Sequence, residues 1–233
     1  NQNSHNNLRL LNLINYNYSF NKNPINRLKT TIGNKINSIN NKKENLKKLK
    51  ERFNSIKDCK IKDYSTKLVF GNGNLDSPLM IIGGVPGAEE DHSGKVFVGK
   101  DGILLEKMLQ AINIKKDNIY ITYAVNYRTP KDRKPNTNEI KKYSNYLQEH
   151  IDIISPKILI LMGSVAMESL TGLNEKISIE RNKWKEIIIK NANYNAIITF
   201  DPSYLLRFPE NKKYSWEDLK KIKQKITDLN LII

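Results

Sequence analysis

The chain has 233 residues and carries 39 lysines and arginines against 24 aspartates and glutamates, a formal net charge of +15 at pH 7. This length accommodates one domain of ordinary size with an appendage. The longest aliphatic run, residues 158–162, is far too short to cross a bilayer, which excludes a transmembrane protein. Among partners we expect nucleic acid and no membrane. The single cysteine, Cys59, excludes a disulfide framework within the chain. We therefore expect a basic globular protein whose partner is a polyanion, with nucleic acid ahead of an anionic membrane.

The N-terminal part differs in composition from the rest. Residues 1–43 contain seven Lys or Arg, fourteen Asn and no acidic residue. Such a segment is typical of an organellar targeting sequence, a nucleic-acid-binding arm or a disordered tail, and it is where we place protein partners. Because the sequence begins at Asn1 rather than Met, we expect processing or truncation. We predict a basic Asn-rich extension over 1–43 and a domain over 44–233.

From residue 44 onward the apolar pattern predicts alternating helices and strands. Apolar spacings of three and four residues indicate helices, and short β-branched or aromatic runs indicate strands. In chain order we expect helix 44–53, strands 68–70 and 79–82, helix 104–112, strand 119–125, helix 137–154, strand 157–162, helix 163–170, strands 187–189 and 196–200, and helix 216–229. Strands buried on both faces indicate a parallel sheet covered on both sides. The predicted fold class is α/β, a three-layer α/β/α sandwich.

Three segments directly follow predicted strands, where sheets of this kind place their sites. Residues 83–102 are rich in glycine, so the backbone can approach a ligand closely and Phe97 can offer a ring face. The second segment offers four cations for phosphate contacts: Arg128, Lys131, Arg133 and Lys134. In the third, Leu205 and Leu206 beside Arg207 suit an apolar wedge that enters a base stack. The alternatives are a glycine-rich turn around a core Phe, a solvated connection and a loop folded onto the core.

In this order, the segments resemble the family 4 uracil-DNA glycosylases, in particular the alphaproteobacterial type. The matching stretches are Pro86–Asp91, Val96–Gly99, Tyr120–Tyr123 with Arg128, and Asp201–Arg207. The resemblance covers roughly residues 56–226 and implies a uracil-DNA glycosylase-like fold with a pocket that receives a flipped uracil. The pocket residues that it implies are Gly83, Gly84, Val85, Pro86, Gly87, Phe97, Tyr123 and Asp201.

The resemblance also implies polar catalytic groups that this sequence lacks. Family members place a Glu in the first loop, read the uracil edge with an Asn and stabilise the departing uracil anion with a His, where this chain has Gly84, Tyr123 and Asp201. The Tyr123 ring would occupy space that the base needs. We expect Asp201 to be ionised beside nearby cations, which places negative charge where negative charge must develop. Each lost donor costs about 10²–10³ in rate, so we expect no intact catalytic residue.

Many family members hold a [4Fe–4S] cluster through four cysteines, and here only Cys59 matches. The other three positions carry Ile56, Tyr127 and Tyr143. One thiolate cannot retain such a cluster, so we expect neither an iron–sulfur cofactor nor another metal.

Three functions stay open. The first is a degenerate glycosylase fold that binds DNA or RNA, as a component of a nucleoprotein assembly such as an organellar ribosome with its rRNA. The expected location is then a mitochondrion or another bacterial-derived compartment, with the bacterial cytoplasm as the alternative. The second is an active uracil-DNA glycosylase of DNA repair that uses rewired residues such as Tyr123 or His92. The third is a protein-interaction module. We favour the first, because it explains the basic segments and the lost donors together.

Overall fold

A computed structural model describes residues 27–57 and 60–233 of the chain, with side chains from residue 36 onward in these ranges. The chain divides into two units, Asn1–Ser38 and Ile39–Ile233. Helix α2 (Arg27–Asn54) runs through the predicted boundary between residues 43 and 44. The extension over 1–43 therefore stays a prediction, and its first 26 residues lie outside the described part, as does Cys59. The following description concerns the second unit.

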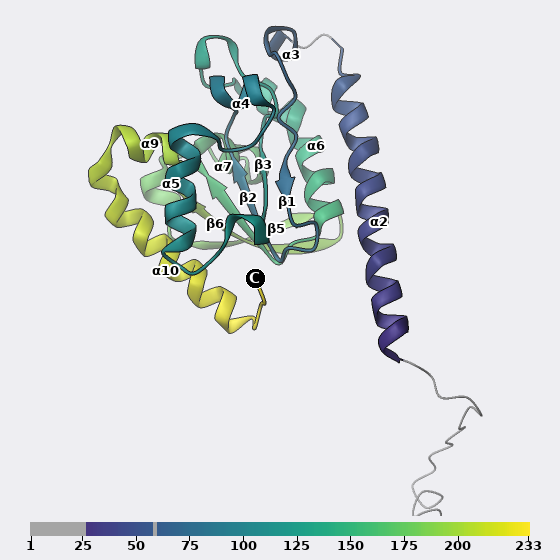
Figure 1. The fold of residues 1–233 in the computed structure, drawn as a ribbon. Coiled ribbons are helices and arrows are strands. Elements are labelled where there is room, and N and C mark those ends of the chain that lie inside the picture. The colour runs from purple at the N-terminus through teal and green to yellow at the C-terminus, as the bar shows by residue number, and fades with distance from the viewer. Residues whose placement is uncertain (1–26, 58–59) are drawn as a thin grey trace, which may run out of the picture. The chain divides into compact units, whose positions relative to one another are not determined.

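A sheet of six strands forms the centre of this unit, in the order β1-β3-β2-β4-β6-β5 (Figure 1). Its four central strands are parallel: β2 (Leu79–Gly83), β3 (Tyr120–Tyr123), β4 (Ile158–Met162) and β6 (Ala192–Thr199). Every residue of β2, β3 and β4 is buried, in agreement with their nearly continuous apolar sequences. Two short antiparallel edges complete the sheet, β1 (Asn72–Gly73) beside β3 and β5 (Trp184–Ile189) beside β6.

Helices cover both faces of the sheet, which confirms the predicted three-layer α/β/α sandwich. Their bounds are α3 (Lys60–Tyr64), α4 (Ala88–Ser93), α5 (Gly99–Gln110), α6 (Thr137–Ile154), α7 (Gly163–Thr171), α8 (Ile177–Glu180), α9 (Pro202–Arg207) and α10 (Lys212–Asp228), with short 3-10 turns η1 (Lys116–Asn118), η2 (Pro130–Asp132) and η3 (Pro209–Asn211). One core contains residues of α2, α6 and α7 with one face of the sheet, and the other contains residues of α5 and α10 with the opposite face. Across the two described ranges, no helix is both long and apolar enough to span a membrane.

The segment 68–70 is not a strand, contrary to the prediction. Its backbone is paired by other means, because the Val69 N–H donates to the carbonyl oxygen of Asn126 at 2.9 Å. The Asn126 side-chain amide donates to the carbonyl oxygens of Val69 and Phe70, and the Thr122 hydroxyl donates to that of Phe70 at 2.6 Å. The backbone polar groups of this segment are therefore hydrogen-bonded without pairing to a neighbouring strand. The nearest strand in sequence, β1, begins two residues later, at Asn72.

The last two strands also differ from the prediction of an all-parallel sheet buried on both faces. Strand β5 is antiparallel to β6, and only two residues, 190–191, connect them. A connection this short can join antiparallel strands only, since a parallel crossover needs a dozen or more residues. As an edge strand, β5 buries Ile187 and Ile189, whereas Ile188 is 72% exposed.

Candidate functional site

A cleft of about 530 Å³ opens at the carboxyl ends of the central strands. Its walls come from the loop after β2, the end of β3, the start of α7 and helix α9, so segments far apart in the sequence meet at one end of the sheet (Figure 1). Seven of the predicted pocket residues line it: Gly84, Val85, Pro86, Gly87, Phe97, Tyr123 and Asp201. The eighth, Gly83, lies behind the rings of Phe97 and Tyr123. The structure therefore brings the predicted pocket residues together at one cleft, and their contact with a base stays a prediction.

Two stacked aromatic rings close the floor of the cleft. The rings of Phe97 and Tyr123 lie 5.0 Å apart at an interplanar angle of 26°, and the Phe97 N–H donates to the Tyr123 hydroxyl at 3.2 Å. Each residue is only 3% exposed. A Cβ at Gly83 would come within 2.7 Å of both rings, so the pair requires glycine at this position. The phenol thus covers one face of the Phe97 ring, the ring on which the resemblance implies that a flipped base stacks.

Asp201 stands at the N-terminus of α9. Its Oδ1 accepts a hydrogen bond from the Ser203 N–H at 2.9 Å, an N-cap. Burial raises the pKa of the Asp201 carboxyl, and nearby Glu90 raises it further, whereas Ser203 and Arg207 act in the opposite direction. Desolvation therefore outweighs the nearby cation in the direction of the shift, and the ionisation of Asp201 stays a prediction.

Further carboxyls gather around the same cleft. Burial raises the pKa of Asp101, and Asp201 and Glu89 raise it further. Burial also raises the pKa of Glu90, which accepts hydrogen bonds from the N–H groups of Gly87 at 3.0 Å and Val98 at 2.9 Å. Glu90 thereby ties two glycine-rich turns together. Four carboxyl residues, Glu90, Asp101, Asp132 and Asp201, line the cleft in a protein of strongly positive net charge.

Two further polar residues of the glycine-rich segment, Asp91 and His92, do not line the cleft. Asp91 accepts hydrogen bonds from the N–H groups of Thr66 at 2.8 Å and Lys67 at 3.1 Å, so it holds the loop before β1. His92, the alternative catalytic residue, is exposed on α4 and is not one of the residues that line the cleft.

Most cations of the predicted phosphate-binding loop are paired with carboxylates. Arg128 donates to both oxygens of Asp132 at 2.7 and 2.8 Å. Arg133 donates to both oxygens of Glu139 at 2.7 and 2.6 Å, and Lys134 pairs with Glu168 at 3.1 Å. Of the four, Lys131 alone is exposed without an ion pair to any described residue. Arg133 and Lys134 line the cleft, but their charge is largely neutralised within the protein.

The predicted apolar wedge is a short helix, α9, and only part of it reaches the surface. Leu205 is 1% exposed and belongs to the core, which rules it out as an inserting side chain in this conformation. Because a helix has 3.6 residues per turn, the adjacent residues Leu205 and Leu206 of α9 face different sides. Leu206 is 38% exposed, and Arg207 lines the cleft.

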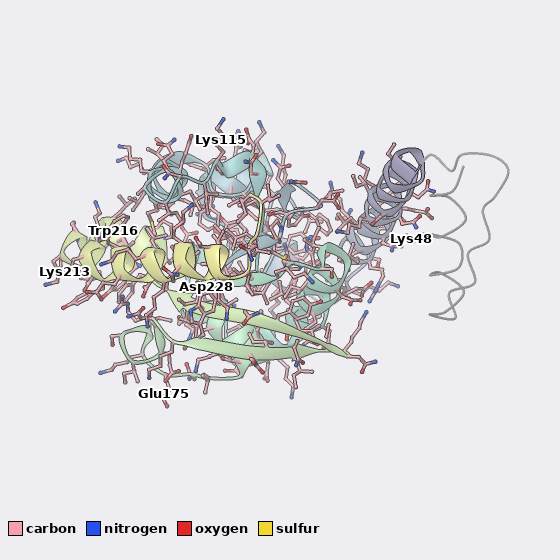
Figure 2. All side chains as sticks on the ribbon, turned by 90° about the horizontal axis from the view of Figure 1, so that it is seen from below. Lys48, Lys115, Glu175, Lys213, Trp216 and Asp228 are labelled. Atoms are coloured by element: carbon pink, nitrogen blue, oxygen red, sulfur yellow. The ribbon has the colours of Figure 1, made fainter. Side chains whose placement is uncertain are left out.

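Exposed aromatic residues follow α9 in the chain, and sequence reasoning missed them. Phe208 and Trp216 are each 44% exposed, and Tyr214 is 39% exposed. Lys213 lies over the Tyr214 ring with its Nζ 4.9 Å from the centroid, and Figure 2 shows Lys213 and Trp216 at the same end of α10. The signal was present in the sequence as aromatic residues interleaved with lysines over 208–216.

Sequence reasoning also missed the start of α7. Gly163, Ser164 and Val165 line the cleft opposite the glycine-rich loop. Gly163 has a φ of +86°, and a Cβ there would lie 3.3 Å from the Asp201 Cβ. A glycine directly after a buried strand was the available indication.

The positions that resemble cluster ligands do not fit an iron–sulfur cluster. Tyr127 donates its hydroxyl to the carbonyl oxygen of Phe53 at 3.2 Å, and its ring packs on Tyr143 with centroids 6.2 Å apart. Ile56 is buried in the same apolar core. Aromatic and aliphatic packing therefore occupies three of the four positions.

Comparison with known proteins agrees with this architecture. The sequence pattern of the Uracil DNA glycosylase superfamily matches residues 70–222. A "Type-4 uracil-DNA glycosylase" of Sulfurisphaera tokodaii is 34% identical over 193 residues, which cover 78% of this chain and 84% of that protein. A protein of the same description from Thermotoga maritima is 33% identical over 175 residues, 74% of this chain and 90% of that protein. A DNA polymerase of Bacillus phage SP01 is 28% identical over 161 residues, only 17% of its length. The chain belongs to the uracil-DNA glycosylase superfamily.

Proposed function

We propose that this protein binds nucleic acid through the uracil-DNA glycosylase fold and does not release uracil. The observation that carries the proposal is the stacking of Tyr123 on Phe97, with ring centroids 5.0 Å apart. A uracil that stacked on Phe97 would have to displace a buried phenol together with its hydrogen bond. The pocket floor is filled by the protein itself.

The chemistry around this floor also opposes glycosidic cleavage. Scission leaves negative charge on the base, so catalysis depends on donors that are directed at its oxygens. Gly84 offers no side chain, and the carboxyls of Asp101 and Asp201 face the same space. Because each missing donor costs about 10²–10³ in rate, the loss of two removes about 10⁴–10⁶ of the acceleration.

The surface beside the cleft supports nucleic-acid binding. Leu206 and Arg207 of α9 are followed by the exposed rings of Phe208 and Trp216. Cations attract phosphates without regard to sequence, and aromatic faces stack on bases with little preference. This combination is typical of single-stranded DNA or RNA binding and requires no enzymatic step.

The proposal is tested by two measurements on the unmodified protein. The protein is incubated with uracil-containing single-stranded and duplex DNA, and abasic sites are then cleaved with alkali, with the Thermotoga maritima relative as the positive control. We expect no strand scission above a no-protein control, and scission would overturn the inactive assignment. Binding to DNA and RNA is measured against salt concentration, where a log–log slope near zero would overturn nucleic-acid binding.

An active uracil-DNA glycosylase is the second candidate, and one observation favours it. Burial raises the pKa of Asp201, and a protonated carboxyl can donate a hydrogen bond to a carbonyl oxygen of the base. Activity of this kind would rise as the pH falls, because the donor is the protonated form. Asp201→Asn would abolish that pH dependence, which separates this candidate from the first.

The wider setting is also proposed rather than established. The acid-free composition of residues 1–43 supports a place in a mitochondrion or another bacterial-derived compartment, and an rRNA of an organellar ribosome as partner. The alphaproteobacterial subtype and protein partners at the extension likewise remain predictions. Identification of the RNA and proteins that co-purify with the tagged full chain tests them together.

A further inference from the structure

The unpaired positive charge of the second unit includes a row of lysines on α2. Lys43, Lys47 and Lys50 are exposed, and none of them forms an ion pair with a described residue. Other cations of this helix are engaged, since Lys48 pairs with Glu44 at 2.7 Å and is labelled in Figure 2. The loop that the sequence favoured for phosphate contacts is mostly neutralised, whereas this row is not.

The three lysines line a groove of about 310 Å³. The opposite wall is the edge strand β1, Asn72–Gly73, which has a neighbouring strand on one side only. Leu46 and Phe70 contribute apolar atoms to the floor. No residue of this groove lines the cleft at the carboxyl ends of the strands. The groove is therefore a separate surface of the same unit.

The helix is firmly attached to the domain over this stretch. Lys42 donates to the carbonyl oxygens of Leu75 at 2.9 Å and Ile154 at 3.0 Å, and it pairs with Asp76 at 3.3 Å. Leu49 and Phe53 are fully buried on the same helix. A fixed support reduces the entropy that must be lost when the lysines engage a ligand.

The spacing of the lysines matches a nucleic-acid backbone. Lys43 and Lys50 are seven residues apart, about 10.5 Å along a helix that rises 1.5 Å per residue. In the helical geometry of B-DNA, three nucleotide steps of one strand rise about 10 Å along the axis at 3.4 Å per step. We propose that the groove between α2 and β1 binds the sugar–phosphate backbone of a nucleic-acid strand, independently of the cleft. An acidic protein would present carboxylates without this repeat, so it is the less suitable occupant.

The test compares two triple variants with equal charge. The groove variant is Lys43→Gln, Lys47→Gln and Lys50→Gln, and the control variant changes three exposed lysines outside groove and cleft, Lys107, Lys115 and Lys223, to Gln. Glutamine has nearly the helix propensity of lysine, and thermal unfolding checks that both variants are folded. The probe is a fluorescein-labelled 30-nucleotide single strand of mixed sequence without uracil, as DNA and as RNA.

We expect the groove variant to lower the slope of log Kd against log salt by about 2, since each neutralised phosphate of a single strand contributes about 0.7. The control variant should change the slope by less than one. Equal slopes in the two variants would overturn the proposal. The double variant Leu206→Ala, Arg207→Gln separately tests the surface beside the cleft. If this double variant loses binding while the groove variant binds like the unmodified protein, the groove proposal alone is overturned. If the groove variant loses binding while the double variant binds like the unmodified protein, the groove proposal is supported and binding beside the cleft is overturned.

Discussion

Replacement of Tyr123 by asparagine removes the ring that covers Phe97 and installs the amide that the family places at this position. Substitution of a buried aromatic side chain by a small one costs about 3–5 kcal/mol. Tyr123 is 3% exposed but borders the open cleft, so water can fill part of the vacated space and the lower figure of about 3 kcal/mol applies. For a domain of this size that loss lowers the Tm by about 6–12 °C. Total stabilities of about 5–15 kcal/mol leave the variant folded.

The assay has a stability arm and a binding arm. The control, Tyr123→Phe, keeps the ring and removes only the hydroxyl that accepts the Phe97 N–H, which costs about 1–2 kcal/mol. In the binding arm, a single strand with one uracil is compared with the same strand carrying cytosine. We expect no preference from the unmodified protein or Tyr123→Phe. Tyr123→Asn should gain a uracil preference of about tenfold, since a well-placed pair of hydrogen bonds to a base edge discriminates by about 1–3 kcal/mol.

Two results would refute the reasoning about this aromatic floor. If Tyr123→Asn were as stable as Tyr123→Phe, the ring would contribute nothing by packing on Phe97. If the unmodified protein already preferred the uracil strand as strongly as Tyr123→Asn, the base would have a binding position that the phenol does not obstruct.

Three further predictions concern ionisable groups in the interior. Burial raises the pKa of Asp201, so its contribution to stability is present at low pH and is lost as the pH rises through the folded-state pKa. Asp201→Asn keeps the N-cap and should flatten the fall in the free energy of unfolding above the unfolded-state pKa of about 4, whereas Asp201→Ala loses about 1 kcal/mol at low pH. Burial lowers the pKa of His150 to about 3, so the free energy of unfolding should fall as the pH drops below 6.5, by about 3 kcal/mol at pH 4. His150→Gln should remove this dependence of the unfolding free energy on pH, as measured by urea titration. Arg181 donates to both oxygens of Asp218 at 2.7 and 3.1 Å, and Asp218 is fully buried. Arg181→Ala should lower the free energy of unfolding by about 3–5 kcal/mol in the same titrations. Adding Asp218→Asn to that variant should recover part of the loss, because no unpaired charge is then left buried.

The parts of the fold that could be predicted are those that depend on local sequence. The runs that became β2 and β4 are continuously apolar because parallel central strands are buried on both faces. Helix α6 has the predicted bounds, Thr137–Ile154, because Asn136 and Glu139 form a capping box and Ser155 leaves the helix in the left-handed region ahead of Pro156.

The errors in the fold arise from contacts between distant residues. Val69 and Phe70 have the composition of a strand, but their carbonyl oxygens are bound by Asn126, 57 and 56 positions later. Leu205 and Leu206 are adjacent and chemically identical, yet one is in the core and the other is at the surface. No local pattern distinguishes such cases.

The electrostatic properties of the site were the least accessible to sequence reasoning. Lys134 pairs with Glu168, 34 positions away, so a loop that reads as basic is partly neutral in the folded chain. The direction of the Asp201 pKa shift is likewise set by burial, which outweighs the opposing contributions of its sequence neighbours Ser203 and Arg207. The identity of a charged residue is visible in the sequence, but its partner and its desolvation are not.

If the cleft and the α2 groove act as proposed, base chemistry and polymer affinity belong to separate parts of this unit. Phosphate contacts position a nucleic acid without reading it, and their strength depends on unpaired cations rather than on pocket shape. Lys43 and Lys47 would therefore bind a nucleic-acid strand regardless of which residues occupy the pocket positions 84, 123 and 201. Conversely, substitutions that reopen the pocket would leave the salt dependence of binding almost unchanged. A uracil preference that appears in Tyr123→Asn without any change in salt slope is the combined outcome that this separation requires.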